Sequence, residues 1–396
     1  MKWKSLFLSL MFLMTMLPLR VKAQDLKPAM HRNYQALIEL QPYVADPARF
    51  KARENYSEIS TLIAQLAGIA DVLPQMMEDK PGMMIIGKVY ADYLNDIQRG
   101  FKNGPTPYVR NKIRTATSFC FECHSTLATT KNYKSAEKKV QNWNLTPHQL
   151  ADFYAATRQF DKAMKSYEFV LMASSSENLE GEDVSDVARA LKNALSLAIR
   201  VKRDPDQALK LLSLVSSRED LPAFFAAQIK QWKKDVLELK KEKKLSETAD
   251  AKVWLDRALY LIARGKKMQT YEADHVADIT YLHAINYIHE ALKRENNSEL
   301  RSQAYAMLGT AYAVLEDPLL WTLDTVYFEA CVREVPHTAL ARQCFDHYAQ
   351  EMYFGFSGSA GLELPPEDAA KLKELQNLAE SERMNISKKK GQKNEK

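Results

Sequence analysis

The sequence of 396 residues predicts an all-α fold. Apolar residues recur every three or four positions, no stretch alternates apolar and polar residues as a half-buried strand does, and prolines and capping residues interrupt the pattern at short intervals. With 46% hydrophobic residues, a chain of this length can form two or more domains. We expect a four-helix bundle over residues 24–130, followed by an array of helical hairpins over residues 131–380.

The N-terminus has the pattern of an export signal. Lys2 and Lys4 precede an apolar run from Leu6 to Leu17, and Val21-Lys22-Ala23 has the small-x-small character of a signal-peptidase site. A retained membrane anchor is the alternative, but it would need about 20 apolar residues to cross a bilayer. We therefore expect residues 1–23 to be a signal peptide, cleaved after Ala23, and the mature protein to be periplasmic.

The basic residues are concentrated at the two ends of the chain. Residues 1–23 contain four basic and no acidic side chains, and residues 387–396 contain five Lys and one Glu, so the formal charge of +5 leaves about −3 for the residues between them. This balance does not favour binding to nucleic acid. We expect residues 381–396 to be a disordered basic tail, with contact to a membrane surface as the weaker alternative.

The segment before residue 130 contains four helical patterns. The first runs from about Leu26 to Val44, the second lies between Pro47 and Pro74, and the third follows Pro81. The fourth opens at Thr106-Pro107, a capping residue followed by proline at the first helical position. Its apolar stripe comprises Val109, Ile113, Ala116, Cys120, Cys123 and Leu127, which places both cysteines on the buried face.

Residues 120–124 read Cys-Phe-Glu-Cys-His, which is the attachment motif of c-type haem. Two thiols three residues apart reach the two vinyl groups of a porphyrin, and the adjacent histidine binds the iron. A thioredoxin-like pair would need a βαβ context, a zinc site would need two further ligands, and a disulfide would leave His124 unexplained. We expect one covalent haem on Cys120 and Cys123, with His124 as the iron ligand.

Four helices with this motif on the last one resemble the class II cytochromes c, the cytochrome c′ and c-556 group. The resemblance covers about residues 24–130, and its specific residues are Cys120, Cys123 and His124. It implies an antiparallel bundle with the haem near one end and, as in the c-556 type, a methionine near the start of the first helix as the second ligand. Met30 occupies that place. The alternatives are His31, an iron with an open site, and the loop residues Met76, Met77, Met83 and Met84.

From residue 144 onward the helical patterns repeat. Residues 158–170 align with residues 203–215 at a period of 45, and a third unit contains Leu308, Gly309 and Tyr312, then Tyr327, Ala330 and Pro336. These small and aromatic positions resemble tetratricopeptide repeats, whose usual period is about 34. The irregular spacing favours a more general array of helical hairpins, for which the resemblance implies a role in protein docking.

The remaining cysteines, Cys331 and Cys344, flank a turn at Pro336. In an oxidising compartment we expect them to form a disulfide, with two free thiols as the alternative. Neither is followed by histidine at haem spacing, so we expect no second haem.

The sequence contains no nucleophile elbow, Walker loop or helix with paired metal-binding histidines, so we do not expect an enzyme. The leading hypothesis is electron transfer, with a periplasmic redox partner or an envelope protein complex docking on the array. The alternative is a periplasmic scaffold whose haem is structural or senses a small gas, and a peroxidase is a weaker third option. Iron coordination distinguishes these hypotheses, because His/Met ligation favours electron transfer and an open iron site favours gas binding.

Overall fold

The structure is a computed structural model that describes residues 26–78, 80–126, 145–173, 184–218, 221–271, 274–294, 297–315, 323–359 and 361–380. Within these ranges the regular structure is sixteen α-helices, short turns of other helix types and one hairpin of two-residue strands, so the predicted all-α fold is confirmed. The expected signal peptide, the basic tail and Leu127 lie outside the described residues. Every helix in the described ranges is too short or too polar to cross a membrane.

Four long helices pack as the expected bundle: α2 (Leu26–Ala45), α4 (Tyr56–Ala67), α5 (Pro81–Phe101) and α6 (Pro107–Thr126). The second helical pattern is divided, because Asp46 caps a short helix α3 (Pro47–Lys51) whose chain then becomes extended at Ala52. A 3-10 turn (Arg53–Asn55) leads into α4, and a second one (Gln75–Met77) precedes α5. Helix α4 ends at Ala67, and the apolar residues that follow it are buried in turns rather than in a helix.

A buried polar contact joins three helices of the bundle. Asn33 of α2 donates from Nδ2 to the carbonyl oxygen of Leu66 in α4 at 3.2 Å, and its Oδ1 accepts from the hydroxyl of Tyr90 in α5 at 3.0 Å. Asn33 and Tyr90 are both almost fully buried. Because an unsatisfied amide would be costly at this depth, these bonds favour one register of the three helices.

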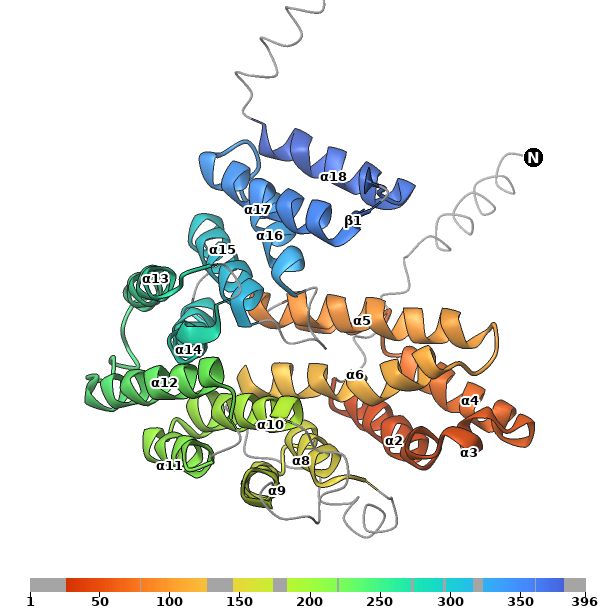
Figure 1. Ribbon diagram of the computed structural model, residues 1–396. Helices are drawn as coiled ribbons and strands as arrows, with labels where there is room; N and C mark the ends of the chain where they lie inside the picture. The colour runs from red at the N-terminus through yellow and green to blue at the C-terminus, as the bar shows by residue number, and fades with distance from the viewer. Residues whose placement is uncertain are drawn as a thin grey trace, which may run out of the picture.

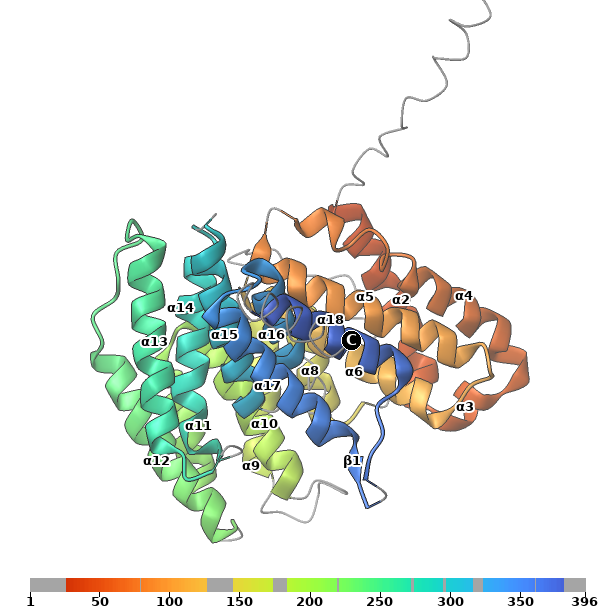
Figure 2. The ribbon, with the colours of Figure 1, turned by 90° about the horizontal axis from the view of Figure 1, so that it is seen from above.

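The second half of the chain is an array of helical hairpins (Figures 1 and 2). Consecutive helices pack against each other from α8 to α12 and again from α13 to α18. A π-helical turn (Leu197–Lys202) follows α10, a 3-10 turn (His275–Ala277) precedes α14, and the strands β1 (Ser357–Gly358) and β2 (Gly361–Leu362) lie between α17 and α18. The helices are α8 (Pro147–Ala156), α9 (Phe160–Ala173), α10 (Val184–Ser196), α11 (Pro205–Ser216), α12 (Ala223–Lys241), α13 (Ala251–Met268), α14 (Asp278–Leu292), α15 (Ser298–Leu315), α16 (Leu323–Glu334), α17 (Ala339–Phe356) and α18 (Pro366–Ala379).

Small residues of the array lie where two helices pack closely against each other. The aligned segments 158–170 and 203–215 fall largely on α9 and α11, as the repeat pattern predicts. Gly309 of α15 faces the ring of Phe328 in α16, where an added Cβ would lie 2.7 Å from ring atoms. Gly265 of α13 faces Tyr281 of α14 in the same way, at 2.8 Å. Gly309 was singled out from the sequence, whereas Gly265 was not.

The bundle and the array share a continuous apolar core. Helix α5 packs against α14 and α16, and α6 packs against α8 and the π-helical turn. One cluster of buried apolar side chains extends from the bundle through α13 to α18, and a second cluster fills α8 to α12. The expected boundary near residue 130 therefore does not separate two independent cores. In Figure 1 the ends of α5 and α6 reach into the array.

Cys331 of α16 and Cys344 of α17 form a disulfide, with their Cα atoms 6.2 Å apart and both side chains buried. The predicted pairing is confirmed.

Replacing both Cys331 and Cys344 with alanine should lower the free energy of unfolding by about 3 kcal/mol, because the bridge restricts the unfolded chain. Urea unfolding followed by circular dichroism measures this loss. Reductant should destabilise the parent by a similar amount and leave the double variant unchanged, and a double variant as stable as the oxidised parent would contradict the expectation.

Candidate haem site

The two cysteines of the motif lie in the last two turns of α6. The helix begins as predicted, with Thr106 Oγ1 accepting from the backbone N–H of Val109 at 3.2 Å. Cys120 and Cys123 are partly buried and take no part in the disulfide between Cys331 and Cys344. Burial raises the pKa of the Cys120 thiol to about 12, and the pKa of Cys123 is also raised, chiefly by burial. The described elements around the pair are helices, so it does not lie in the βαβ context of a thioredoxin-like motif.

His124 is buried beside the array. Its Nδ1 lies 3.3 Å from the carbonyl oxygen of Ala156 at the end of α8, and it donates there when the proton is assigned to Nδ1. Burial, with Arg158 nearby, lowers the pKa of His124 to about 4, so the ring is neutral at neutral pH. A neutral imidazole with Nδ1 bonded to a carbonyl has its Nε2 lone pair available, which is the usual state of a metal-binding histidine.

Met30, Cys120 and His124 line one small cavity. Met30 lies in the first turns of α2 and is partly buried, which places it opposite the end of α6 as the bundle topology predicts. The cavity has a volume of about 20 Å³ and mostly apolar walls. Cys123 does not line it and packs against the core shared by the bundle and α13 to α18. The structure thus brings three of the four predicted site residues around one space.

The alternative second ligands lie elsewhere. His31 follows Met30 directly but is exposed. Met77 is buried against Gly87, where its sulfur would lie 3.0 Å from an added Cβ. Met83 and Met84, which were expected in the loop, lie in the first turn of α5, and none of the four methionines lines the cavity at Cys120 and His124. The described ranges also hold no group of three or more His, Cys, Asp or Glu placed to bind a metal ion.

The array forms one wall of the cavity, which the sequence did not reveal. Phe153 and Ala156 of α8, and Thr157 directly after it, line it together with residues of α2. Phe153 also packs with Ile38 of α2 in a small apolar cluster. Ala156 contributes its backbone carbonyl, which any residue type carries, so no pattern of side chains could have marked this position. The spatial neighbour of the motif is therefore a helix of the second half of the chain.

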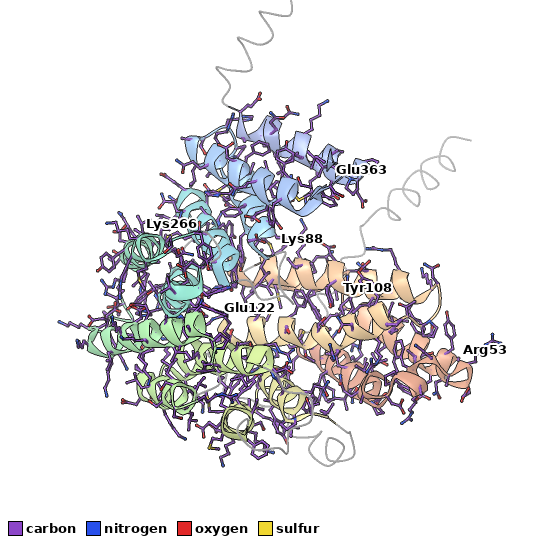
Figure 3. The ribbon with its side chains drawn as sticks, viewed as in Figure 1. Arg53, Lys88, Tyr108, Glu122, Lys266 and Glu363 are labelled. Atoms are coloured by element: carbon purple, nitrogen blue, oxygen red, sulfur yellow. A yellow bond between two sulfur atoms is a disulfide. The ribbon has the colours of Figure 1, made fainter. Side chains whose placement is uncertain are left out.

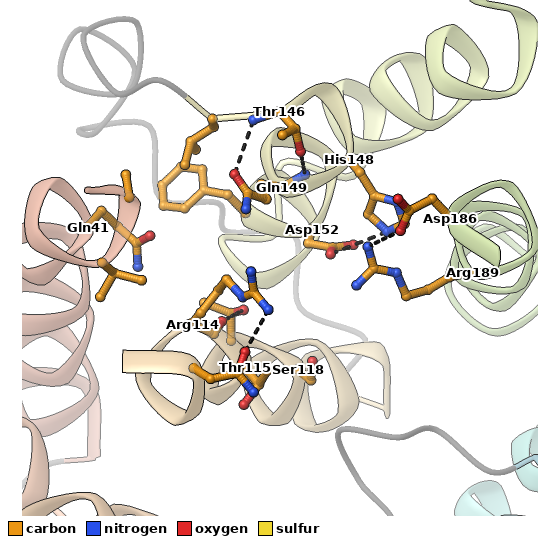
Figure 4. A pocket seen from close by; sticks show the side chains of 16 residues that line it. Gln41, Arg114, Thr115, Ser118, Thr146, His148, Gln149, Asp152, Asp186 and Arg189 are labelled. Atoms are coloured by element: carbon orange, nitrogen blue, oxygen red, sulfur yellow. Dashed lines mark hydrogen bonds and ion pairs between the residues drawn. The ribbon is translucent and has the colours of Figure 1, made fainter. Parts of the chain in front are cut away.

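A larger hollow adjoins the small cavity and shares Gln41, Thr117 and Phe153 with it. Its volume is about 400 Å³, and it is bounded by α2, α6, α8 and α10 (Figure 4). Its wall is more polar and carries five ionisable side chains, namely Arg114, His148, Asp152, Asp186 and Arg189. The two spaces together follow α6 from His124 back to Asn111.

The residue types at this site fit a covalently attached haem. The motif supplies two thiols one helical turn apart and a neutral histidine held by a carbonyl, and Met30 brings a thioether to the cavity that Cys120 and His124 line. The small cavity is well below the roughly 300–1,000 Å³ of ligand pockets, so it does not hold a porphyrin by itself. The adjoining hollow is within that range, and it continues along the same face of α6.

Glu122, the residue between the two thiols, forms a buried ion pair with the array. Its carboxylate oxygens accept from Arg200 Nη1 at 2.7 Å and Nη2 at 2.6 Å, and the Tyr312 hydroxyl donates to Oε1 as well. Burial opposes ionisation of Glu122, but Arg200 and Tyr312 outweigh it and lower the pKa of Glu122 below its ordinary value. Figure 3 shows Glu122 near the centre of the molecule, where α6 meets the array.

Arg200 reaches Glu122 from the π-helical turn that continues α10. The wider turn leaves backbone groups that need other partners. Asn286 of α14 donates from Nδ2 to the carbonyl oxygen of Ile199 at 3.0 Å, and Asp204 donates its N–H to the carbonyl oxygen of Ala198 at 3.0 Å.

Tyr312 stacks on Tyr327 with ring centres 5.5 Å apart, and the Tyr327 hydroxyl donates to the carbonyl oxygen of Gly82 in α5 at 3.2 Å. No short-range pattern in the sequence marks this network.

Glu122→Gln should lower the free energy of unfolding by about 3–5 kcal/mol, because Arg200 would stay buried without its counter-charge. Adding Arg200→Met should restore much of the loss, since it removes the unpaired charge. Urea unfolding of the single and double variants measures both effects. Asp256→Asn, which breaks an exposed pair with Lys252, is the matched control and should cost less than about 1 kcal/mol. A Glu122→Gln loss as small as the control would show that the pair contributes little.

Comparison with known proteins finds no relative of this chain. No family model, no curated protein and no solved structure matches the chain. The chain is an all-α protein with a helical hairpin array, and its function is inferred from its own residues.

Proposed function

We propose that this protein is an exported mono-haem c-type cytochrome that transfers electrons, with a helical array for protein docking. Cys120 and Cys123 would hold the haem through thioether bonds, His124 would bind the iron from one side, and Met30 from the other. The haem would supply an iron that gains and loses one electron. The protein would act in the periplasm, after removal of residues 1–23.

The position of Met30 carries the proposal. The motif alone supports attachment, and a thioether on the same cavity as His124 supports a closed, six-coordinate iron. Such ligation suits electron transfer, because it favours the reduced state and leaves no open position for a gas or for peroxide. The apolar lining from α2 and α8 supports the same function, since burial and hydrogen bonding near the iron set its potential.

The array supports the docking part of the proposal. It shares a core with the bundle, so a partner bound to it would be held at a fixed distance from the haem site. A periplasmic redox protein or an envelope protein complex is the partner class that we propose. The described hairpins resemble repeat architectures, whose extended surfaces commonly bind proteins.

The exported protein should carry one covalent haem. When it is produced in a host that matures c-type cytochromes, its intact mass should exceed that of the chain from residue 24 onward by one haem. Cys120→Ala with Cys123→Ala should abolish this addition, because no thioether can form. Cys331→Ala with Cys344→Ala is the matched control and should keep the haem. A mature parent protein without haem would disprove the proposed function.

Met30→Ala should open the iron to CO and lower the midpoint potential. We expect at least a tenfold change in the Fe(III)/Fe(II) equilibrium, which is 59 mV for one electron, and loss of the weak ferric absorbance band at the red edge of the spectrum. Met30→Leu keeps the side-chain volume but removes the sulfur, so it should change CO binding and the midpoint potential as Met30→Ala does. His31→Ala is the control, because His31 is exposed. A Met30 variant that keeps the parent spectrum would show that Met30 only packs. A parent that already binds CO would favour the gas-binding alternative.

A further inference from the structure

The polar hollow beside the motif is not used by the proposed iron ligands. It lies between the bundle and the array, and its wall contains Arg114 of α6 and Arg189 of α10 (Figure 4). Thr117 lines both this hollow and the cavity at Cys120, so the two spaces meet along α6 between Arg114 and Cys120. Cys120 lies six positions after Arg114, a rise of about 9 Å along an α-helix.

Arg114 is the cation of this hollow that lacks a carboxylate partner within the described ranges. Its Nη2 donates to the neutral Asn111 Oδ1 at 2.6 Å, and its side chain is accessible from the hollow. Partial burial lowers the pKa of Arg114, and the neighbouring Arg110 and Arg189 lower it further. In Figure 4 the Arg114 side chain points between Gln41 and Asp152, towards the middle of the hollow.

The acidic groups of the hollow have partners of their own. Asp186 accepts from Arg189 Nη2 at 2.8 Å. Asp152 accepts from the Tyr167 hydroxyl at 2.6 Å and from Asn193 Nδ2 at 3.2 Å. These bonds join both carboxylates to residues other than Arg114, although both carboxylates also act on the pKa of Arg114 across the hollow and oppose its lowering.

A second donor in the hollow is buried and lacks a hydrogen bond. His148 is 2% exposed, and neither of its ring nitrogens has a hydrogen-bond partner among the described residues. Its Nε2 lies 3.5 Å from Asp152 Oδ2. Buried polar groups are nearly always bonded, so a missing partner at this place points to a ligand. The hollow thus offers a guanidinium and an imidazole to a bound anion.

We infer that this hollow binds the two carboxylate side chains of the haem, with Arg114 as their principal partner and with His148 and Arg189 beside them. The inference rests on the proposed covalent haem. Haem carries its two carboxylates on the side of the ring away from the vinyl groups, one of which would be tied to Cys120 in the cavity that adjoins this hollow. Guanidinium groups bind carboxylates with two parallel hydrogen bonds, and Arg114 is placed to do so.

The test compares the full-length haem protein with Arg114→Gln. Loss of the guanidinium leaves carboxylate charge uncompensated and stabilises Fe(III), so the Fe(III)/Fe(II) equilibrium should shift at least tenfold towards Fe(III), or 59 mV for one electron. The midpoint potential should also become pH-dependent between about pH 5 and 8, because a carboxyl without its guanidinium titrates closer to neutrality. The other charged or titratable groups that face Arg114 are His148 and Asp152 from α8, and Asp186 and Arg189 from α10.

Arg99→Gln is the matched control, because Arg99 lies on α5 with an exposed side chain paired to Asp96. A second measurement uses Arg114→Lys, which keeps the charge and is the milder change if Arg114→Gln fails to accumulate. In redox-difference infrared spectra the haem carboxylate bands should shift in Arg114→Lys and stay in place in Arg99→Lys.

The outcomes separate this inference from the proposed function. A parent protein without covalent haem overturns both. A haem-loaded parent overturns the inference alone if Arg114→Gln changes the midpoint potential no more than Arg99→Gln at every pH. Carboxylate bands that are unchanged in Arg114→Lys overturn it as well. Larger and pH-dependent shifts in Arg114→Gln, with moved bands in Arg114→Lys, support it.

Discussion

The buried ion pair between Glu122 and Arg200 determines how the two halves of the chain meet. It joins residues 78 positions apart, and the Tyr312 hydroxyl adds a bond from 190 positions away. Removing two charges from water is costly, and a pair this deep is stable only when its geometry is good and its remaining oxygen lone pairs are used. The carboxylate meets both conditions, because Arg200 bonds both of its oxygens and Tyr312 bonds one of them again, whereas the Nε of Arg200 is buried without a hydrogen-bond partner among the described residues. Since Glu122 stands between the two thiols, this contact also places Cys120, Cys123 and His124 against the array.

Short-range patterns predicted much of the bundle. The limits of α2, α5 and α6 follow from apolar spacing, prolines and the cap at Thr106, all of which act within one or two turns. The position of Met30 opposite the motif followed from the bundle topology together with the resemblance to the c-556 type, because an antiparallel bundle returns its fourth helix to the start of its first. The second helix was expected to be continuous, since its apolar spacing runs on to Leu73. The structure instead uses those later positions in turns that still bury them.

The short-range patterns could not predict which residues of the array contribute to the site, for physical reasons. A helix periodicity shows which face is buried and not which partner covers it. Ala156 acts through a backbone carbonyl, and Arg200 depends on a π-helical turn that leaves no clear mark in the sequence. One signal was present in α5, whose buried residues include Gly82, Ile85, Ile86, Tyr90 and Leu94, a set too wide for one face. A helix buried on several sides lies between two layers, and α5 does lie between the bundle and the array.

The shared core changes the meaning of the array in the proposed cytochrome. A docking module on a flexible linker would leave the redox centre unaffected by what the module binds. Here Ala156 bonds the ring of His124, Phe153 lines the cavity of Met30, and Arg200 neutralises the charge between the thiols. Each of these contacts belongs to the array and acts on a quantity that sets a haem potential, namely ligand basicity, burial or nearby charge. The array in this architecture is therefore part of the proposed haem site, and a partner that displaced α8 or the π-helical turn would alter the potential through these same three contacts.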